Sequence, residues 1–273
     1  MPAPSSDRHA GVFFLLVMLI GAMGYVPAML SSYGIIPTDY SVLALLGGVS
    51  PLIAALIASR RSEGPRGPDM VFSAFGRRSF PGRWYVVAIL LPVIMFAAAI
   101  LLSSVSGNPY NLQSLNLMLF VPAFLSSIVM NVWEEIGWRG YALPKLQERH
   151  GAMTSGVVVG VFWALWHWPL FMMRDSQMLA NYGSYSVFFI DSILLSLVYV
   201  WLYNSTDGNL IIPTLFHAGT NAAGIVLLME TGYAMDSLYL MTVYAVAALL
   251  VIAFNPRDSL SRRGRAVLTG ASK

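Results

Sequence analysis

Long apolar stretches, separated by short polar segments, recur along the whole chain. Each approaches the roughly 20 residues that a helix needs to cross the hydrocarbon core of a membrane. We therefore predict eight membrane-spanning helices, at residues 11–31, 41–58, 84–103, 114–133, 152–172, 184–203, 209–229 and 236–255. Because an open sheet cannot satisfy its backbone hydrogen bonds in lipid, the predicted fold is an all-α, polytopic transmembrane helical bundle.

The composition agrees with this pattern. The chain of 273 residues is 57% hydrophobic and only 11% charged, whereas soluble domains carry about 25% charged residues. No stretch between the spans is long enough for a soluble domain, so residues 1–273 are predicted to form a single membrane domain. Segment 69–83 mixes aromatic residues with arginines, which is typical either of a helix or loop lying at the lipid headgroups or of a plain basic loop.

The positive charges predict an orientation. When both chain ends lie on the same side of an eight-span bundle, all of the 16 Lys and Arg residues except Arg174 fall on that side. The positive-inside rule then predicts a multi-pass protein of the cell membrane with both termini in the cytoplasm. The net charge of +3 follows from this bias, so the lipid bilayer is a predicted partner and nucleic acid is not.

Two adjacent acids follow the fourth predicted span, in the stretch NVWEEIGWRG. Burying an Asp at the centre of a membrane helix costs at least about 2.5–3.5 kcal/mol, so an ionisable group there needs a reason. Glu135 and Arg139 are four residues apart and share a helical face, which favours an ion pair. Glu134 points about 100° away and is free to face a cavity. The alternative is an ordinary helix end in water.

Further polar groups occur in later spans. His167 lies among tryptophans, while His217 and Asn221 are four residues apart on one helical face. Each alone is more typical of a hydrogen-bonded structural group. Together with a carboxylate, however, these side chains are the parts of a hydrolytic site, with a general base and donors for an oxyanion. Zinc held by His167, His217 and a Glu is the alternative, although the HExxH motif is absent.

The sequence excludes cysteine chemistry, argues against a transporter and leaves one acid, Asp191, without an assigned role. The chain has no cysteine, which excludes disulfides, a thiolate nucleophile and a cysteine-ligated metal. It also shows no internal repeat of the kind that many transporters have. Asp191 lies within the sixth span and is expected to pair with another polar group of the bundle or to lie near the outer interface.

Three motifs now resemble a known family. The stretch EEIGWRGYALPKLQ has the form EExxxR, WALWH resembles FxxxH, and HAGTN fits HxxxN. Their order and placement resemble those of the CPBP intramembrane endopeptidases, which comprise the type II CAAX prenyl proteases and the bacteriocin-immunity (Abi) proteins. The resemblance covers roughly residues 115–230, which are expected to form the catalytic core.

The resemblance implies a role for each matched residue. Glu134 corresponds to the glutamate that activates the attacking water, and His167 to the histidine that assists it. His217 and Asn221 correspond to the third motif, as oxyanion stabilisers or, in the metalloprotease view, with His217 as a zinc ligand. Zinc is thus possible but is not required by the preferred mechanism.

The remaining motif residues are expected to be structural. Glu135 and Arg139 complete the first motif and receive a supporting role. Trp163 occupies the place of the usual Phe in the second motif, and its larger ring is expected to narrow the cavity.

The expected function is cleavage of membrane-embedded or lipidated, CAAX-type peptides by an intramembrane endopeptidase. The alternative is a non-catalytic membrane binding or bacteriocin-immunity protein on the same scaffold.

The depths of these residues do not agree with the predicted spans. At about 1.5 Å per residue, His167 lies about 22 Å and His217 about 12 Å from the inner ends of their spans, whereas Glu134 lies at the inner end of span four. We therefore expect the helix of span four to continue through Arg139, and span five to begin later than residue 152.

Overall fold

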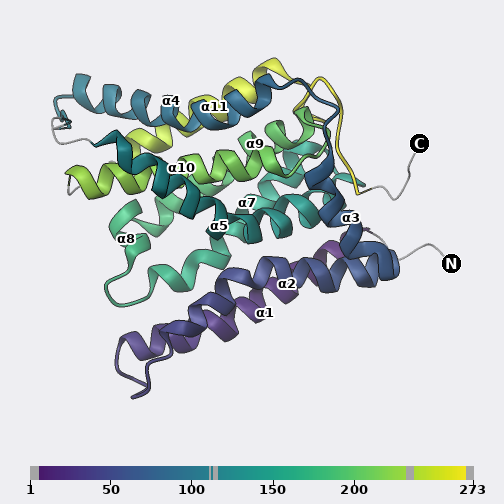
Figure 1. Cartoon of the computed structure of the whole chain (residues 1–273), viewed down its shortest axis with the longest axis horizontal. Helices are drawn as coiled ribbons and strands as arrows, with labels where there is room; N and C mark the ends of the chain where they lie inside the picture. The colour runs from purple at the N-terminus through teal and green to yellow at the C-terminus, as the bar shows by residue number, and fades with distance from the viewer. Residues whose placement is uncertain (1–5, 111, 113–115, 232–236, 269–273) are drawn as a thin grey trace.

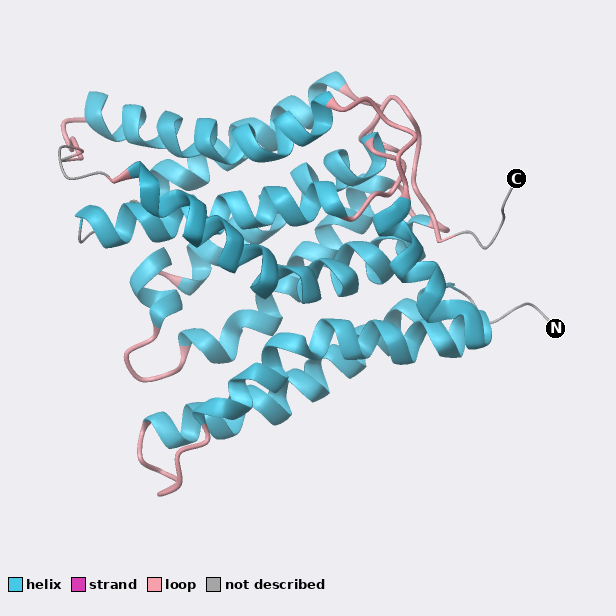
Figure 2. Cartoon of the chain, viewed as in Figure 1, coloured by secondary structure: helices cyan, strands magenta, loops and turns pink. Residues whose placement is uncertain are grey.

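The computed structural model describes residues 6–110, 112, 116–231 and 237–268. These residues form helices and connecting loops, with no strand among them (Figure 2). Eight helical segments of the described chain are long and apolar enough to cross a membrane. The predicted all-α transmembrane bundle is therefore confirmed.

Every predicted span coincides with a long helix. In chain order these helices are α1 (Ser6–Ser32), α2 (Ala44–Glu63), α4 (Arg83–Val105), α5 (Phe120–Gly137), α7 (Ala152–Phe171), α9 (Tyr185–Ser205), α10 (Ile211–Thr231) and α11 (Ser237–Phe254). Three short helices lie between them: α3 (Gly67–Ser73), α6 (Leu143–Gln147) and α8 (Gln177–Tyr182).

The long helices run along a common direction (Figure 1). The α1–α2 hairpin forms one edge of the bundle and α4 with α11 the opposite edge, with α5, α7, α9 and α10 between them. Within this arrangement α7 packs on α9, and α10 packs on both α5 and α4. Helix α1 begins and α11 ends at the same end of the bundle, as an even number of spans requires (Figure 1).

The helix of span four is longer than its hydropathy indicates. Helix α5 continues through a π-helix, η5 (Trp138–Ala142), into α6, so one helical segment runs from Leu117 to Gln147. At about 1.5 Å per residue, Glu134 lies about 20 Å from the inner end of this segment. The expected extension of span four is confirmed, whereas the expected late start of span five is wrong, since α7 begins at Ala152.

The beginning of α10 explains the remaining difference in depth. The loop before it is buried beneath segment 67–77: the Leu210 backbone N–H donates to the Ala74 carbonyl at 3.3 Å, and Asn209 Nδ2 donates to the Arg77 carbonyl at 2.6 Å. Because segment 67–77 covers this loop, α10 starts beneath a cap, and His217 in its second turn is buried. Segment 69–83 therefore begins as a helical cap over this loop, rather than as a plain basic loop.

Two glycines allow the helices around the polar residues to approach closely. A Cβ at Gly137 of α5 would lie 2.4 Å from the Cβ of Pro51 in α2, and a Cβ at Gly160 of α7 would lie 2.7 Å from the Cα of Ile193 in α9. Separations under about 3 Å are not tolerated, so these contacts need glycine. Close packing of α7 on α9 brings the polar residues of both helices to one place.

Candidate active site

A buried ionic cluster connects α5 with α10. Oε1 of Glu135 accepts hydrogen bonds from Nη1 of Arg139 at 2.9 Å and from Nδ1 of His217 at 2.8 Å. The Glu135 and Arg139 side chains are fully buried, and the guanidinium carbon of Arg139 lies 3.7 Å from the centre of the Tyr199 ring. The predicted ion pair is therefore confirmed, and it also fixes the imidazole of His217.

Glu134 faces away from this cluster and contacts α7. Its Oε2 accepts a hydrogen bond from the indole Nε1 of Trp163 at 2.7 Å. The same tryptophan accepts a hydrogen bond at its backbone carbonyl from Nδ1 of His167, at 2.8 Å. Because Nδ1 carries the proton in that bond, the neutral His167 ring keeps Nε2 as a free acceptor. Glu134 is thus oriented by Trp163, whereas the sequence predicted that it was free.

Asn221 lies one helical turn after His217 and contacts α5. Its Nδ2 donates to Oδ1 of Asn131 at 3.1 Å. A carboxamide carries two N–H donors, so one donor of Asn221 is left for a further acceptor. Asn131 itself is buried and lies four residues before Glu135, on the same face of α5. The predicted alignment of His217 and Asn221 is confirmed.

The four predicted catalytic side chains line one buried cavity of about 70 Å³. They come from α5, α7 and α10, and α9 completes the wall with Phe188, Asp191, Ser192, Leu195 and Tyr199. A cavity of this volume holds a few water molecules. The chain therefore brings a carboxylate, two imidazoles and a carboxamide together around a space that can hold water.

A second cavity, of about 150 Å³, adjoins the first. The two share Met178 and Tyr182 of α8 with Thr220 and Asn221 of α10. Burial raises the pKa of Tyr182 above its usual range, so its phenol stays protonated and can donate a hydrogen bond. The second cavity is lined by both apolar and polar side chains, and it extends the space beside Asn221.

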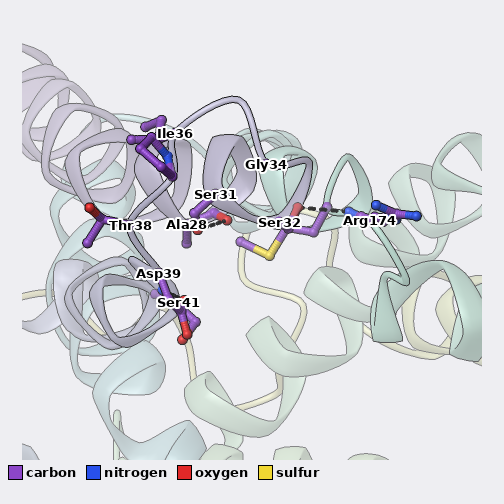
Figure 3. Close-up of a pocket in the computed structure, with 12 residues that line it drawn as sticks. Ala28, Ser31, Ser32, Gly34, Ile36, Thr38, Asp39, Ser41 and Arg174 are labelled. Carbon is purple, nitrogen blue, oxygen red and sulfur yellow. Dashed lines mark hydrogen bonds between the residues drawn. The ribbon is translucent and has the colours of Figure 1, made fainter.

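The larger hollow between the α1–α2 loop and the α7–α8 loop has a different character (Figure 3). Its volume is about 340 Å³. The backbone N–H of Arg174 donates to Oγ of Ser32 across it at 3.0 Å. The Ser41 backbone N–H holds the pKa of the Asp39 carboxyl below its usual value. This hollow shares no lining residue with the polar cavity and contains no imidazole, so we do not assign it to catalysis.

Sequence reasoning missed three residues that position the site. Trp163 was treated as a wall, although it donates to Glu134 and its ring lies 5.6 Å from the rings of both His167 and His217. Asn131 and Tyr199 were not considered. The only feature of the sequence that pointed to Asn131 was its spacing of four residues from Glu135. No feature pointed to Tyr199, because its partner Arg139 is distant in the sequence.

The cavity does not fit a zinc ion held by three protein ligands. His167 and His217 each use Nδ1 for a hydrogen bond and expose Nε2, as zinc-binding histidines do. A catalytic zinc site needs a third protein ligand, and the described residues contain no group of three His, Cys, Asp or Glu side chains in a metal-holding arrangement.

Comparison with known proteins agrees with this geometry. The family model of the Rce1-like type II CAAX prenyl endopeptidases matches residues 115–223. This range contains Glu134, His167, His217 and Asn221. Residues 115–223 are thus similar to the Rce1-like family. The resemblance found in the sequence is thereby confirmed.

A protein from Methanococcus maripaludis named CAAX prenyl protease 2 is similar to this chain. It is 24% identical to this chain over 188 residues, which is 65% of this chain and 69% of the relative. With eight apolar helices, the chain is a multi-pass membrane protein, and its relatives support a peptidase.

Proposed function

We propose that this protein is an intramembrane endopeptidase that cleaves membrane-embedded or lipidated peptides, including peptides of the CAAX type. The observation that carries the proposal is the buried cavity, in which Glu134, His167, His217 and Asn221 meet from three helices. All four residues lie in the segment that matches the Rce1-like peptidases. The lipid bilayer and a peptide are accordingly its partners.

The first step is attack by water on the scissile carbonyl. Glu134 takes a proton from the water, because its carboxylate faces the cavity and is held in place by Trp163. His167 accepts a hydrogen bond from the same water at its free Nε2. A general base of this kind contributes roughly 10²- to 10⁴-fold to the rate.

The second step is collapse of the tetrahedral intermediate. The N–H of Asn221 that is not bound to Asn131 donates to the oxyanion. His217 is the second group at the oxyanion, and Glu135 holds its ring in place through Nδ1. The proton that Glu134 took from the water then passes to the leaving amine, directly or through Nε2 of His167, which restores the base.

The arrangement of the chain in the membrane is part of the proposal. We place both termini in the cytoplasm because the Lys and Arg residues, except Arg174 and the buried Arg139, fall in segments on the side of the chain ends. Residues 1–273 act as a single membrane domain, with 115–230 as the catalytic core. The proposal is tested by incubating the purified protein with lipidated and unlipidated peptides and detecting products by mass spectrometry; cleavage that does not depend on Glu134 contradicts it.

The Trp163→Phe substitution tests how Glu134 is oriented. Phe keeps an aromatic ring but removes the indole N–H that donates to Oε2 at 2.7 Å. We expect kcat to fall by about tenfold or more, with a smaller change in KM, because the base loses its fixed orientation while the peptide site remains. Steady-state cleavage rates measure both constants.

Trp166→Phe is the matched control for Trp163→Phe. Trp166 is also buried, and its Nε1 donates to Oγ of Ser50 at 2.9 Å, outside the cavity. We expect a similar loss of stability, about 1 kcal/mol, but a nearly unchanged kcat. An equal loss of kcat in both variants contradicts the positioning role of Trp163.

Metal dependence tests the glutamate-based mechanism separately. Because the cavity lacks a third ligand in a metal-holding arrangement among the described residues, we expect cleavage to continue in excess chelator. Elemental analysis of the active protein is expected to find less than one zinc per chain. Loss of activity in chelator that zinc restores contradicts this expectation.

A further inference from the structure

Asp191 is a buried acid that the proposed mechanism does not use. It lies in the seventh position of α9 and is only 1% exposed. Neither of its carboxylate oxygens has a hydrogen-bond partner among the described residues. Of the two alternatives expected from the sequence, pairing with another polar group of the bundle is therefore wrong within the described structure, and a place near the outer interface stays a prediction. An ionised carboxylate buried without a protein partner is strongly unfavourable, so in this form Asp191 calls for a partner from outside the described protein, either water in the cavity or a ligand.

The side chain of Asp191 lines the same cavity as the catalytic residues. The cavity wall on α9 consists of residues spaced every three or four positions, from Phe188 through Asp191 and Leu195 to Tyr199, which is the spacing of one helical face. On the other side of α9, Ile190 is 46% exposed. Asp191 thus belongs to the inward face and not to the face that meets lipid.

The cavity is lined by acids without a neighbouring cation. Glu134 and Asp191 both line it, and no Lys or Arg does. The nearby Arg139 is committed to Glu135 and to the ring of Tyr199. A ligand with a positive charge supplies what this cavity lacks, because a charge-assisted hydrogen bond would satisfy Asp191.

We propose that Asp191 binds a cationic nitrogen of the peptide. The nitrogen belongs either to a Lys side chain beside the scissile bond or to the amino terminus that hydrolysis creates. Both are ammonium groups small enough to enter from the adjoining cavity of about 150 Å³. The inference rests on the proposed function and adds to it a preference for positively charged peptide groups.

Two sets of peptides distinguish the sources of the ammonium group. In the first, substrates that differ only by Lys or norleucine beside the scissile bond are compared. In the second, product peptides with a free or an acetylated amino terminus are compared as inhibitors. We expect the unmodified protein to favour the charged member of at least one set by about tenfold or more, and Asp191→Asn to lose this preference.

Ser192→Ala is the matched control for Asp191→Asn. Ser192 also lines the cavity, but its Oγ donates to the Phe188 carbonyl of its own helix at 2.8 Å, so its removal is expected to leave the preference unchanged. Asp191→Glu keeps the negative charge and is therefore expected to keep part of the preference for charged peptides. No preference in either set, or a preference that survives Asp191→Asn, overturns the proposal.

Binding to Glu134→Gln separates this inference from the proposed function. That variant is expected to bind peptides without cleaving them, so the affinities of the Lys and norleucine peptides are measured on it with and without Asp191→Asn. Charge-dependent binding without any cleavage by the unmodified protein contradicts the proposed function alone. Glu134-dependent cleavage without charge-dependent binding contradicts the role of Asp191 alone.

Discussion

Glu134→Gln is expected to lower the rate of peptide cleavage by roughly 10²- to 10⁴-fold, because it removes the general base. Glutamine has nearly the same shape as glutamate, and its carbonyl oxygen can still accept the hydrogen bond from Nε1 of Trp163. The variant therefore keeps the shape of the cavity while losing the proton acceptor. The measurement is the rate of product formation in micelles or vesicles, followed by mass spectrometry.

The control for this variant is Glu63→Gln. Glu63 pairs with Lys145 and does not line the catalytic cavity, so its neutralisation is expected to leave the cleavage rate nearly unchanged. Thermal unfolding must show that both variants are folded. Undiminished cleavage by folded Glu134→Gln contradicts the assignment of Glu134 and leaves His167 as the base.

Arg139→Met is expected to have the largest effect on stability. Its guanidinium is fully buried and pairs with Glu135, which is also fully buried. Removing one partner of a buried ion pair leaves a charge without compensation, at a cost of about 3–5 kcal/mol. We expect a large decrease in the thermal unfolding midpoint, measured in micelles, or a low yield of folded protein.

Two further variants make this result interpretable. Arg149→Met removes an ion pair with Asp7 whose side chains are 52% and 43% exposed, and it is expected to change stability by less than about 1 kcal/mol. The double variant Glu135→Gln with Arg139→Met contains no unpaired buried charge, so it is expected to be more stable than Arg139→Met alone. A double variant as unstable as the single one contradicts a mainly electrostatic cause.

The extension of span four illustrates what a sequence pattern can and cannot decide. Glu134, Glu135, Arg139 and Lys145 interrupt the apolar run, so hydropathy places the end of the helix before them. In the folded chain these charges have partners inside the bundle or at its inner end, and the helix continues to Gln147. Only the disagreement in depth among the motifs indicated this from the sequence.

The roles of Trp163 and Tyr199 could not be predicted from the sequence for a related reason. Trp163 was recognisable as a departure from the family motif, but its hydrogen bond to Glu134 joins residues 29 positions apart in the chain. Likewise, the contact of Arg139 with Tyr199 joins α9 to the π-helix that follows α5. Helical spacing relates residues within about one turn, and it carries no information on which helices become neighbours.

The sequence by itself determined the class of fold, the eight spans, the ion pair of Glu135 with Arg139, and the residue types of a hydrolytic site. These follow from local rules: apolar length decides whether a helix crosses lipid, and spacing decides which side chains share its face. Only the tertiary structure decided the depth of each residue, the hydrogen bond that orients Glu134, and the place of Asp191 in the same cavity as Glu134, His167, His217 and Asn221. These depend on how α5, α7, α9 and α10 pack together, because contacts between helices are set by the shape of their whole surfaces.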